Sequence, residues 1–415
     1  MTTQMKARIL SEHTIATVKA TAPILEQEGE TLTRHFYQRM FTHNPEVTPF
    51  FNPANQQAGL QQKALAGAIC AYAANIDNLE VLGNAVELIA QKHVSLQIQA
   101  QHYPIVGRHL LASISEILGE GATGEVLDAW AEAYGYLAHI LVGREAQIYS
   151  EHAQAAGGWV GFRALNVVRK VEESEAITSF YLAPEVGQRL PDFKPGQYIT
   201  VRVPTANGNT TMRNYSLSDK PGQPWYRISV KRETGTSAGT PDGYLSTFLH
   251  STVSVGDNLE IAPPCGEFFL DVRTPPQRPL VLLSAGVGIT PIMSMLASAL
   301  ETDPQRQIVF VHGCLNESSQ AFKEAVDDLA ARHPNLTTHY RYSDPNAQGA
   351  MLRSGASGGL IDVDLIESLL PERDGDFYFC GPQPFMAGIY HGLRAWGVPP
   401  AQVHFEFFGP KQALQ

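Results

Sequence analysis

The first 150 residues carry the hydrophobic spacing of amphipathic helices. Val86, Ile89, Ala90 and His93 recur at intervals that place them on one helical face. A longer stretch, which ends at Ile148, repeats this spacing. Five of the 27 prolines lie in this part of the chain, and proline disrupts helix interiors because it lacks the N–H and clashes with the preceding turn. We therefore predict a helical first domain.

From about residue 161 the pattern changes to that of strands. Ala176–Leu182 and Trp225–Val230 read as strands bounded by turns rich in proline and glycine. Near residue 278 a continuous apolar run, Pro279–Ser284, indicates a strand buried on both faces of a parallel sheet. A helix pattern, the strand Gln307–His312 and the helix Ser319–Arg332 follow it. This alternation predicts a doubly wound α/β domain.

These changes of pattern divide a chain of 415 residues, which is long for one hydrophobic core, into three domains. We assign residues 1–148 to an all-α domain and residues 149–160 to a linker, since Ala153–Gly158 is small and turn-prone. Residues 161–274 form the strand-rich domain, and residues 275–415 form the α/β domain.

Composition narrows the classes of protein to be considered. The hydrophobic fraction of 44% is that of a folded globular protein. A net charge of −11 argues against general affinity for nucleic acid or an anionic membrane, although a local basic pocket is compatible with it. We find no apolar run near the roughly 18 residues of a membrane span and no secretory signal at the start. The four cysteines lie far apart without a C-x-x-C pair, so we expect no disulfide framework and a cytoplasmic location.

A glycine-rich turn follows the apolar strand of the α/β domain. It reads Gly286-Val287-Gly288-Ile289-Thr290-Pro291 and precedes the helix pattern Ile292–Leu300. Glycine lets the backbone approach a pyrophosphate, and a helix N-terminus offers unpaired N–H groups and a positive dipole end. This G-x-G-x-T-P differs from the G-x-G-x-x-G fingerprint, and a simple tight turn is the alternative interpretation.

A second turn belongs to the same kind of sheet edge. The strand Phe377–Phe379 ends in Cys380-Gly381-Pro382, and ligands of open α/β sheets bind at the carboxyl ends of the strands. The alternative for Cys380 is a small buried hydrophobic residue.

The strand-rich domain contains Arg213-Asn214-Tyr215-Ser216 on a predicted strand. At a period of two, Arg213 and Tyr215 share one face, and Ser216 lies on the other face or at the strand edge. Arginine suits a flavin phosphate through its planar donor fork, and tyrosine offers a ring and a hydroxyl to a flavin. A surface strand with an exposed arginine is the alternative.

His93 is a candidate metal ligand in the helical domain. It stands out among the 14 histidines because it lies plainly on the hydrophobic stripe of a helix. A packed helical domain can hold a haem through one axial imidazole. From the residues alone, a hydrogen-bonded core histidine is the more frequent explanation.

In chain order, R-x-Y-S, the Gly243 to Ser246 turn, G-x-G-x-T-P and C-G-P resemble the ferredoxin-reductase-like flavoproteins over about residues 160–415. The resemblance implies an FAD-binding β-barrel and an α/β domain that binds NAD(P)H. It also implies an aromatic residue over the isoalloxazine, for which Phe408 is the candidate and a core phenylalanine the alternative. The other residues assigned to the cofactors are Tyr198, Phe407, Gly409 and Pro410.

The helical domain extends the resemblance to nearly the whole chain. His35–Phe41, Gln91–His93, Tyr103–Gly107 and Arg144–Ala146 resemble the globin domain of flavohaemoglobins, the nitric oxide dioxygenase family. The resemblance implies haem b, FAD and NAD(P)H as cofactors. Electrons would pass from nicotinamide through flavin to haem, where dioxygen oxidises nitric oxide to nitrate. It also implies a monomer whose haem pocket can take a lipid or an azole.

The family pattern implies a role for each haem-side residue. His93 is the proximal ligand, and Glu145 and Tyr103 bond each other and orient its imidazole, which increases the ligand's electron donation. Tyr37 donates to dioxygen from the distal side. The further assignments are Gln61 at the place of a distal histidine, Phe51 and Leu65 as pocket walls, and Lys92 and Glu406 near the haem–flavin junction.

The sequence departs from the family at three places. The loop Gly235–Asp242 is long, Thr247 stands where asparagine is common, and Phe407 stands where a smaller residue is frequent. The segment His312–Glu317 offers no lysine or arginine to a 2′-phosphate, which favours NADH over NADPH. A flavin reductase with a helical docking module, an oxygen carrier or gas sensor, and a peroxidase-like side activity are the alternative functions.

Overall fold

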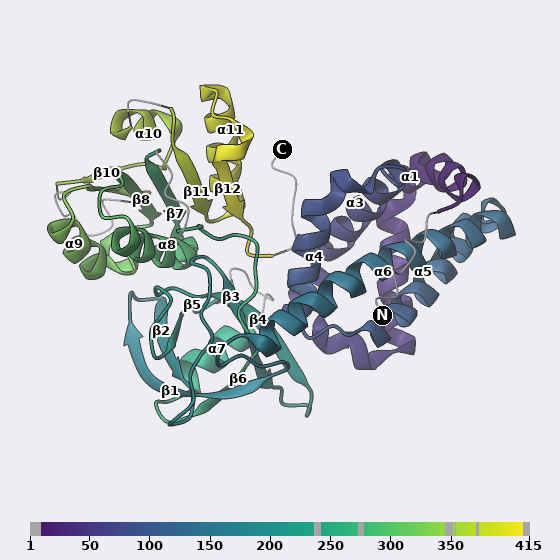
Figure 1. The fold of residues 1–415 in the computed structure, drawn as a ribbon, viewed down its shortest axis with the longest axis horizontal. Coiled ribbons are helices and arrows are strands. Elements are labelled where there is room, and N and C mark those ends of the chain that lie inside the picture. Colours follow the sequence, from purple (N-terminus) through teal and green to yellow (C-terminus); the bar gives the residue numbers. More distant parts are fainter. Residues whose placement is uncertain are drawn as a thin grey trace, which may run out of the picture. The chain divides into compact units, whose positions relative to one another are not determined.

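The computed structural model describes residues 10–235, 242–272, 278–344, 352, 354–370 and 373–409. Pro410 and residues 236–241 of the long loop lie outside these residues. The chain forms two compact units, one mainly of residues up to Ala153 and one mainly of residues from Gln154 onward (Figure 1). No helix in the described ranges has the length and apolar character needed to cross a membrane.

The first unit is helical, as predicted. Its α-helices are α1 (Glu12–His43), α2 (Pro53–Gln57), α3 (Leu60–Ala74), α4 (Gly83–Ser95), α5 (Tyr103–Leu118) and α6 (Gly124–Gln154). Short 3₁₀ turns connect them at η1 (Pro45–Phe50), η2 (Leu79–Leu82), η3 (Ala100–His102) and η4 (Gly119–Gly121). Helix α6 continues to Gln154, six residues past the expected end of the helical domain, because nothing before Ala155-Ala156-Gly157 interrupts its backbone hydrogen bonds.

The apolar stripe of α1 makes the core of this unit. Val18, Leu25, Leu32 and Phe36 recur at helical spacing and are 0–2% exposed. Ser11 caps the helix by accepting a hydrogen bond from the Thr14 N–H at 3.0 Å. The helix continues through Pro23, so the exclusion of proline from helix interiors does not hold there.

The second unit begins with an antiparallel six-stranded sheet in the order β4-β3-β6-β1-β2-β5. A bridge between Leu217, just after β4, and Ile228 in β5 joins the two edges, so the sheet closes into a barrel. Apolar side chains from all its strands fill the interior. The strands are β1 (Arg163–Glu172), β2 (Ile177–Ala183), β3 (Tyr198–Pro204), β4 (Thr210–Ser216), β5 (Tyr226–Lys231) and β6 (Asn258–Ile261), with helix α7 (Tyr244–Ser251) between β5 and β6.

The parallel sheet of the second unit has the order β10-β9-β8-β7-β11-β12. The order reverses between β7 and β11, which is the point where doubly wound sheets bind ligands. Its strands are β7 (Leu280–Ala285), β8 (Ile308–Cys314), β9 (Leu336–Tyr342), β10 (Ala356–Gly358), β11 (Asp376–Cys380) and β12 (Val403–Glu406). The helices are α8 (Ile289–Thr302), α9 (Lys323–Arg332), α10 (Val363–Leu369) and α11 (Gln383–Trp396), with 3₁₀ turns η5 (Gly286–Gly288), η6 (Glu317–Ser319) and η7 (Pro400–Gln402).

Two local predictions were wrong. The helix expected from Ser319 begins at Lys323, because Asn316 caps a separate 3₁₀ turn before it. The expected turn from Gly243 to Ser246 is the start of α7, with Gly243 at its N-cap position.

The barrel and the parallel sheet also share one core, in which Ile177, Phe268 and Leu270 pack with residues of α8.

Candidate active site

His93 on α4 lies in a compact hydrogen-bonded cluster with residues from α5 and α6. Its Nδ1 is 2.8 Å from Glu145 Oε1 and 3.1 Å from the Tyr103 hydroxyl. The Tyr103 hydroxyl donates to the same Glu145 oxygen at 2.5 Å. The structure therefore brings together three residues that are up to 52 positions apart, as the family resemblance implies.

Burial keeps the Tyr103 hydroxyl of this cluster protonated. The pKa of the Tyr103 hydroxyl is raised, first by burial and then by its hydrogen bond to Glu145. Tyr103 thus stays a neutral donor at any physiological pH. Glu145 is 2% exposed, and a buried carboxylate requires such donors.

The surroundings of His93 fit an axial haem ligand. In the described part of the chain the ring makes its hydrogen bonds through Nδ1, which leaves Nε2 available to a metal. The side chain is 33% exposed although that of Glu145 is 3% exposed, so protein atoms cover only part of the His93 side chain. An imidazole held by a carboxylate at its other nitrogen is the usual arrangement of a metal-bound histidine.

Aromatic side chains pack around the ring of Tyr37, whose hydroxyl is expected on the distal side. Tyr37 is 6% exposed, and its ring centroid lies 5.0 Å from Phe36, 5.8 Å from Phe41 and 5.6 Å from Phe51. Burial raises the pKa of Tyr37. Among the described residues none accepts a hydrogen bond from this hydroxyl, whereas buried tyrosine hydroxyls usually have a partner. Tyr37 therefore suits a bound ligand.

The other predicted wall residues lie in the same unit. Phe51 and Leu65 are half-buried and pack against the helical core. Gln61, in the first turn of α3, accepts a hydrogen bond from Gln56 at 2.9 Å. That hydrogen bond occupies the side-chain oxygen of Gln61 and not its amide nitrogen. Lys92 is exposed on α4, and Glu406 lies in the other unit at the end of β12.

A residue that sequence reasoning missed is Tyr134 on α6. Its hydroxyl donates to the Tyr103 backbone carbonyl at 2.7 Å and so holds the start of α5. The ring fits only because position 107 is glycine, where a Cβ would lie 2.5 Å from Tyr134 Cε1. Gly107 belongs to a segment that carries the family resemblance, but Tyr134 has no sequence signal, since the pairing depends on how α5 and α6 pack.

The R-x-Y-S segment lies on β4, with Arg213 and Tyr215 half-buried and Ser216 buried, so Arg213 is not the exposed arginine of the alternative interpretation. Burial lowers the pKa of Arg213, a desolvation cost that a phosphate would offset. Burial raises the pKa of Tyr215. Asn214 accepts a hydrogen bond from Thr200 at 3.0 Å.

The start of α7 supplies further groups that fit a flavin diphosphate. The predicted Ser246, in the first turn, already donates to the Gly243 carbonyl at 3.0 Å and accepts from the Glu233 N–H at 3.2 Å. The Oγ1 atom of Thr247 is buried without a hydrogen-bond partner in the described ranges. The helix N-terminus adds N–H groups and a favourable dipole. Tyr198 on β3 is 6% exposed and packs over Gly266.

The two glycine turns of the parallel sheet meet at its reversal point. A Cβ on Gly288 would lie 2.1 Å from the Cys380 carbonyl oxygen and 2.7 Å from the Gly381 nitrogen. Gly286 has φ +53°, which favours glycine. Ile289 begins α8 and Pro291 lies in its first turn, where the missing N–H costs nothing. The Thr290 hydroxyl donates to the Val287 carbonyl at 3.0 Å, and Pro382 is the N-cap residue of α11.

The thiol of Cys380 is fully buried and packs in the core. Its pKa is raised by burial and then by the charge of Glu406, which occupies the paired position on β12. Cys380 is thus a neutral thiol at the carboxyl end of β11, next to the glycine turn. The small-hydrophobic interpretation of this residue is compatible with that position.

The C-terminal aromatics differ in exposure. Phe408 is 50% exposed, so it is not the core phenylalanine of the alternative interpretation. Phe407 packs edge-on against Phe405 with ring centroids 5.7 Å apart. Gly409 has φ +148°.

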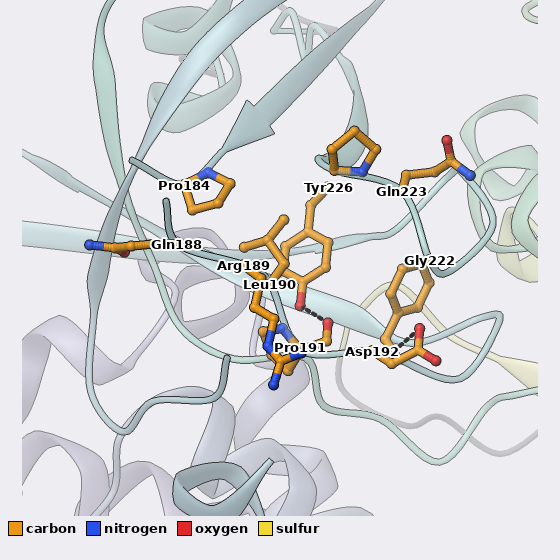
Figure 2. A pocket seen from close by; sticks show the side chains of 11 residues that line it. Pro184, Gln188, Arg189, Leu190, Pro191, Asp192, Gly222, Gln223 and Tyr226 are labelled. Atoms are coloured by element: carbon orange, nitrogen blue, oxygen red, sulfur yellow. Dashed lines mark hydrogen bonds between the residues drawn. The ribbon is translucent and has the colours of Figure 1, made fainter. Parts of the chain in front are cut away.

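A cavity of about 350 Å³ in the second unit shares no residue with the predicted sites. Pro184, Arg189, Gln223 and Tyr226 are among its lining residues. Figure 2 shows the Tyr226 hydroxyl donating to the Pro191 carbonyl, at 2.6 Å. This hydrogen bond ties the loop after β2 to β5.

Three protein families match successive parts of the chain. Residues 34–141 match the globin family, residues 164–270 the oxidoreductase FAD-binding domain and residues 282–391 the oxidoreductase NAD-binding domain.

The curated relatives match over nearly the whole chain. Flavohemoproteins of Rhodopirellula baltica and Bordetella pertussis are 48% and 49% identical to it, over 98% and 97% of this chain and 99% of each relative.

Two solved structures agree with this assignment. Flavohemoglobin from Malassezia yamatoensis, with bound FAD and heme, has the same fold, with a TM-score of 0.82 at 24% identity over 96% of this chain and 100% of that one. The flavohem-like FAD/NAD-binding domain of nitric oxide dioxygenase from Vibrio cholerae is 36% identical, with a TM-score of 0.53, and covers 60% of this chain and 99% of its own. The chain belongs to the flavohemoprotein family, as an oxidoreductase that joins a haem-binding globin domain to FAD- and NAD-binding domains.

Proposed function

We propose that this protein is a nitric oxide dioxygenase. The observation that carries the proposal is the His93–Glu145–Tyr103 cluster, in a chain that also holds the FAD and nicotinamide domains. When bound, nicotinamide, FAD and haem supply hydride transfer, single-electron transfer and the oxidation of nitric oxide by dioxygen to nitrate. Side chains of the protein would bind these groups, orient them and supply hydrogen bonds to them.

On the proximal side, His93 would hold the iron through Nε2. Glu145 would accept a hydrogen bond from the His93 Nδ1–H and thereby increase electron donation by the imidazole. Tyr103 donates to Glu145, which fixes the carboxylate in place and supplies one of the donors its burial requires. With haem bound, a strongly donating imidazole at this place would favour oxidative chemistry over simple reversible binding of dioxygen.

On the reductase side, Arg213 and the start of α7 would hold the flavin diphosphate, with Tyr215 along the ring and Phe408 as its cover. The Gly286–Pro291 turn would bind the nicotinamide cofactor at the reversal point of the sheet. We favour NADH, because residues 312–317 carry no lysine or arginine for a 2′-phosphate. A cytoplasmic location fits this dependence on NADH.

The proposal is tested on the purified holoprotein. Reduction by NADH should give an absorption spectrum with a carbon-monoxide-sensitive haem band, and nitric oxide under air should then disappear with nitrate as the product. A missing haem band would instead indicate a flavin reductase whose helical unit is a docking module. Dioxygen binding without nitric oxide turnover would indicate an oxygen carrier or sensor.

Tyr37→Phe should lower kcat/KM for nitric oxide oxidation about 100-fold or more, as loss of a donor aimed at developing negative charge does. Dissociation of dioxygen, followed by stopped-flow absorption, should become faster. The matched control is Tyr72→Phe, which removes a buried hydroxyl that bonds the Ala133 carbonyl at 2.8 Å. Equal dioxygen dissociation rates in the wild type and Tyr37→Phe would contradict the distal role.

A further inference from the structure

Helix α4, which carries His93, is anchored weakly by hydrophobic burial. Its buried residues are Ala90, Gln91, Val94 and Ser95, of which only Val94 has a branched apolar side chain. Burial stabilises in proportion to the apolar area removed from water, so these residues contribute little. The orientation of α4 must therefore depend on specific side-chain contacts.

One such contact joins α4 to α6 through Arg144 and Glu87. The guanidinium donates from Nε to Glu87 Oε2 at 2.6 Å and from Nη2 to Glu87 Oε1 at 2.9 Å. Gln91, one turn further along α4, also donates to Glu87 Oε1 at 3.0 Å and holds the carboxylate in position. The pair is bidentate, which adds geometric specificity.

This pair differs from an ordinary surface ion pair. The side chains of Arg144 and Glu87 are only 27% and 25% exposed. The ion pairs that contribute little to stability are those exposed to solvent. Arg144 also donates to Glu151, at 3.1 Å, but Glu151 is 64% exposed and lies on α6 itself. That second contact does not reach α4.

Neighbouring residues of α6 thus meet α4 at two points. Glu145 bonds His93, and Arg144, the residue before it, bonds Glu87. His93 and Glu87 are six positions apart, or about 9 Å along the helix axis. Two contacts at that separation restrict both the rotation and the tilt of α4.

We propose that Arg144 is a positioning residue for the haem ligand. Its clamp on Glu87 holds α4 in the orientation that brings His93 Nδ1 within 2.8 Å of Glu145. The inference rests on the proposed role of His93 as the iron ligand. Without the clamp the hydrogen bond to Glu145 lengthens, and the imidazole donates less electron density to the iron.

The test is the iron–histidine stretching band of the ferrous holoprotein, measured by resonance Raman, together with the haem midpoint potential. Glu145→Gln sets the reference shift to lower frequency. Arg144→Met and Glu87→Gln should each shift the band in the same direction by a smaller amount and raise the potential. The double variant should shift it no further than the larger single change, because both remove one interaction.

The matched control is Glu151→Gln, which removes the other ion pair of Arg144 and should leave the band unmoved. Arg144→Lys, which keeps the charge but loses the planar fork, should give an intermediate shift. Circular dichroism of each variant verifies folding, and Glu87→Gln serves if Arg144→Met does not fold.

Three results overturn different claims. A wild-type band that Arg144→Met and Glu87→Gln leave unmoved, or that Glu151→Gln moves equally, would overturn the clamp alone. Absence of an iron–histidine band in the wild type would overturn the proposed ligand and, with it, the clamp. A band that Glu145→Gln does not move would overturn the effect of Glu145 on the ligand, through which the clamp acts.

Discussion

His93→Gly should yield a protein that retains FAD and NADH oxidation but loses stable haem binding and nitric oxide consumption. Without the imidazole the iron has no axial protein ligand, while the barrel and the parallel sheet keep cores of their own. NADH-dependent ferricyanide reduction should stay within about twofold of the wild type, since that reaction needs the reductase side alone. Haem content and nitric oxide consumption should both fall to background.

Glycine rather than alanine is chosen because it leaves room for added imidazole. Millimolar imidazole should restore haem binding in this variant, although without the fixed contact between Nδ1 and Glu145 the nitric oxide activity should recover only partly. His139→Ala, at an exposed position on α6, is the control and should leave haem content and nitric oxide consumption unchanged. Full haem content and activity in His93→Gly without imidazole would show that another residue holds the iron.

Gly288→Ala should have the opposite effect, with haem chemistry intact and hydride transfer impaired. The added methyl would lie 2.1 Å from the Cys380 carbonyl oxygen and 2.4 Å from its carbon, so backbone must move. Such overpacking typically destabilises a protein by about 1–3 kcal/mol. A displacement of about 1 Å at the nicotinamide site can slow the reaction about 100-fold.

Stopped-flow reduction of the flavin by NADH measures this effect directly. Dithionite-reduced Gly288→Ala should still show the carbon-monoxide-sensitive haem band. Gly388→Ala on α11 is the matched control, because a Cβ there meets nothing within 4 Å. A normal rate of flavin reduction in Gly288→Ala would mean that the turn does not position nicotinamide.

The sequence pattern was sufficient to predict an element where the spacing of residues within that element determines its structure. The apolar strands at Ala176–Leu182 and Pro279–Ser284, and the helical face that carries His93, correspond to β2, β7 and α4. Periodicity reports which face of an element is buried, and burial of that face stabilises the element. Helix ends were less accurate, as at Gln154 and Lys323, because capping and fraying decide them.

The candidate sites depended on pairs of segments far apart in the chain. From its own neighbours His93 was most simply a core histidine, and the family resemblance was needed to favour a haem ligand. The contacts with Glu145 and Tyr103 exist because α4, α5 and α6 converge. The backbone contact between Gly288 and Cys380 likewise exists because β7 and β11 are adjacent in the sheet.

The sequence by itself determined the order of elements, the motifs and, through resemblance, the three cofactors. Only the tertiary structure decided that Arg144 reaches Glu87, that Tyr134 needs glycine at position 107, and that Phe408 is exposed. Local spacing specifies one face of one element. Which side chain of another element meets that face is determined by packing over the whole unit.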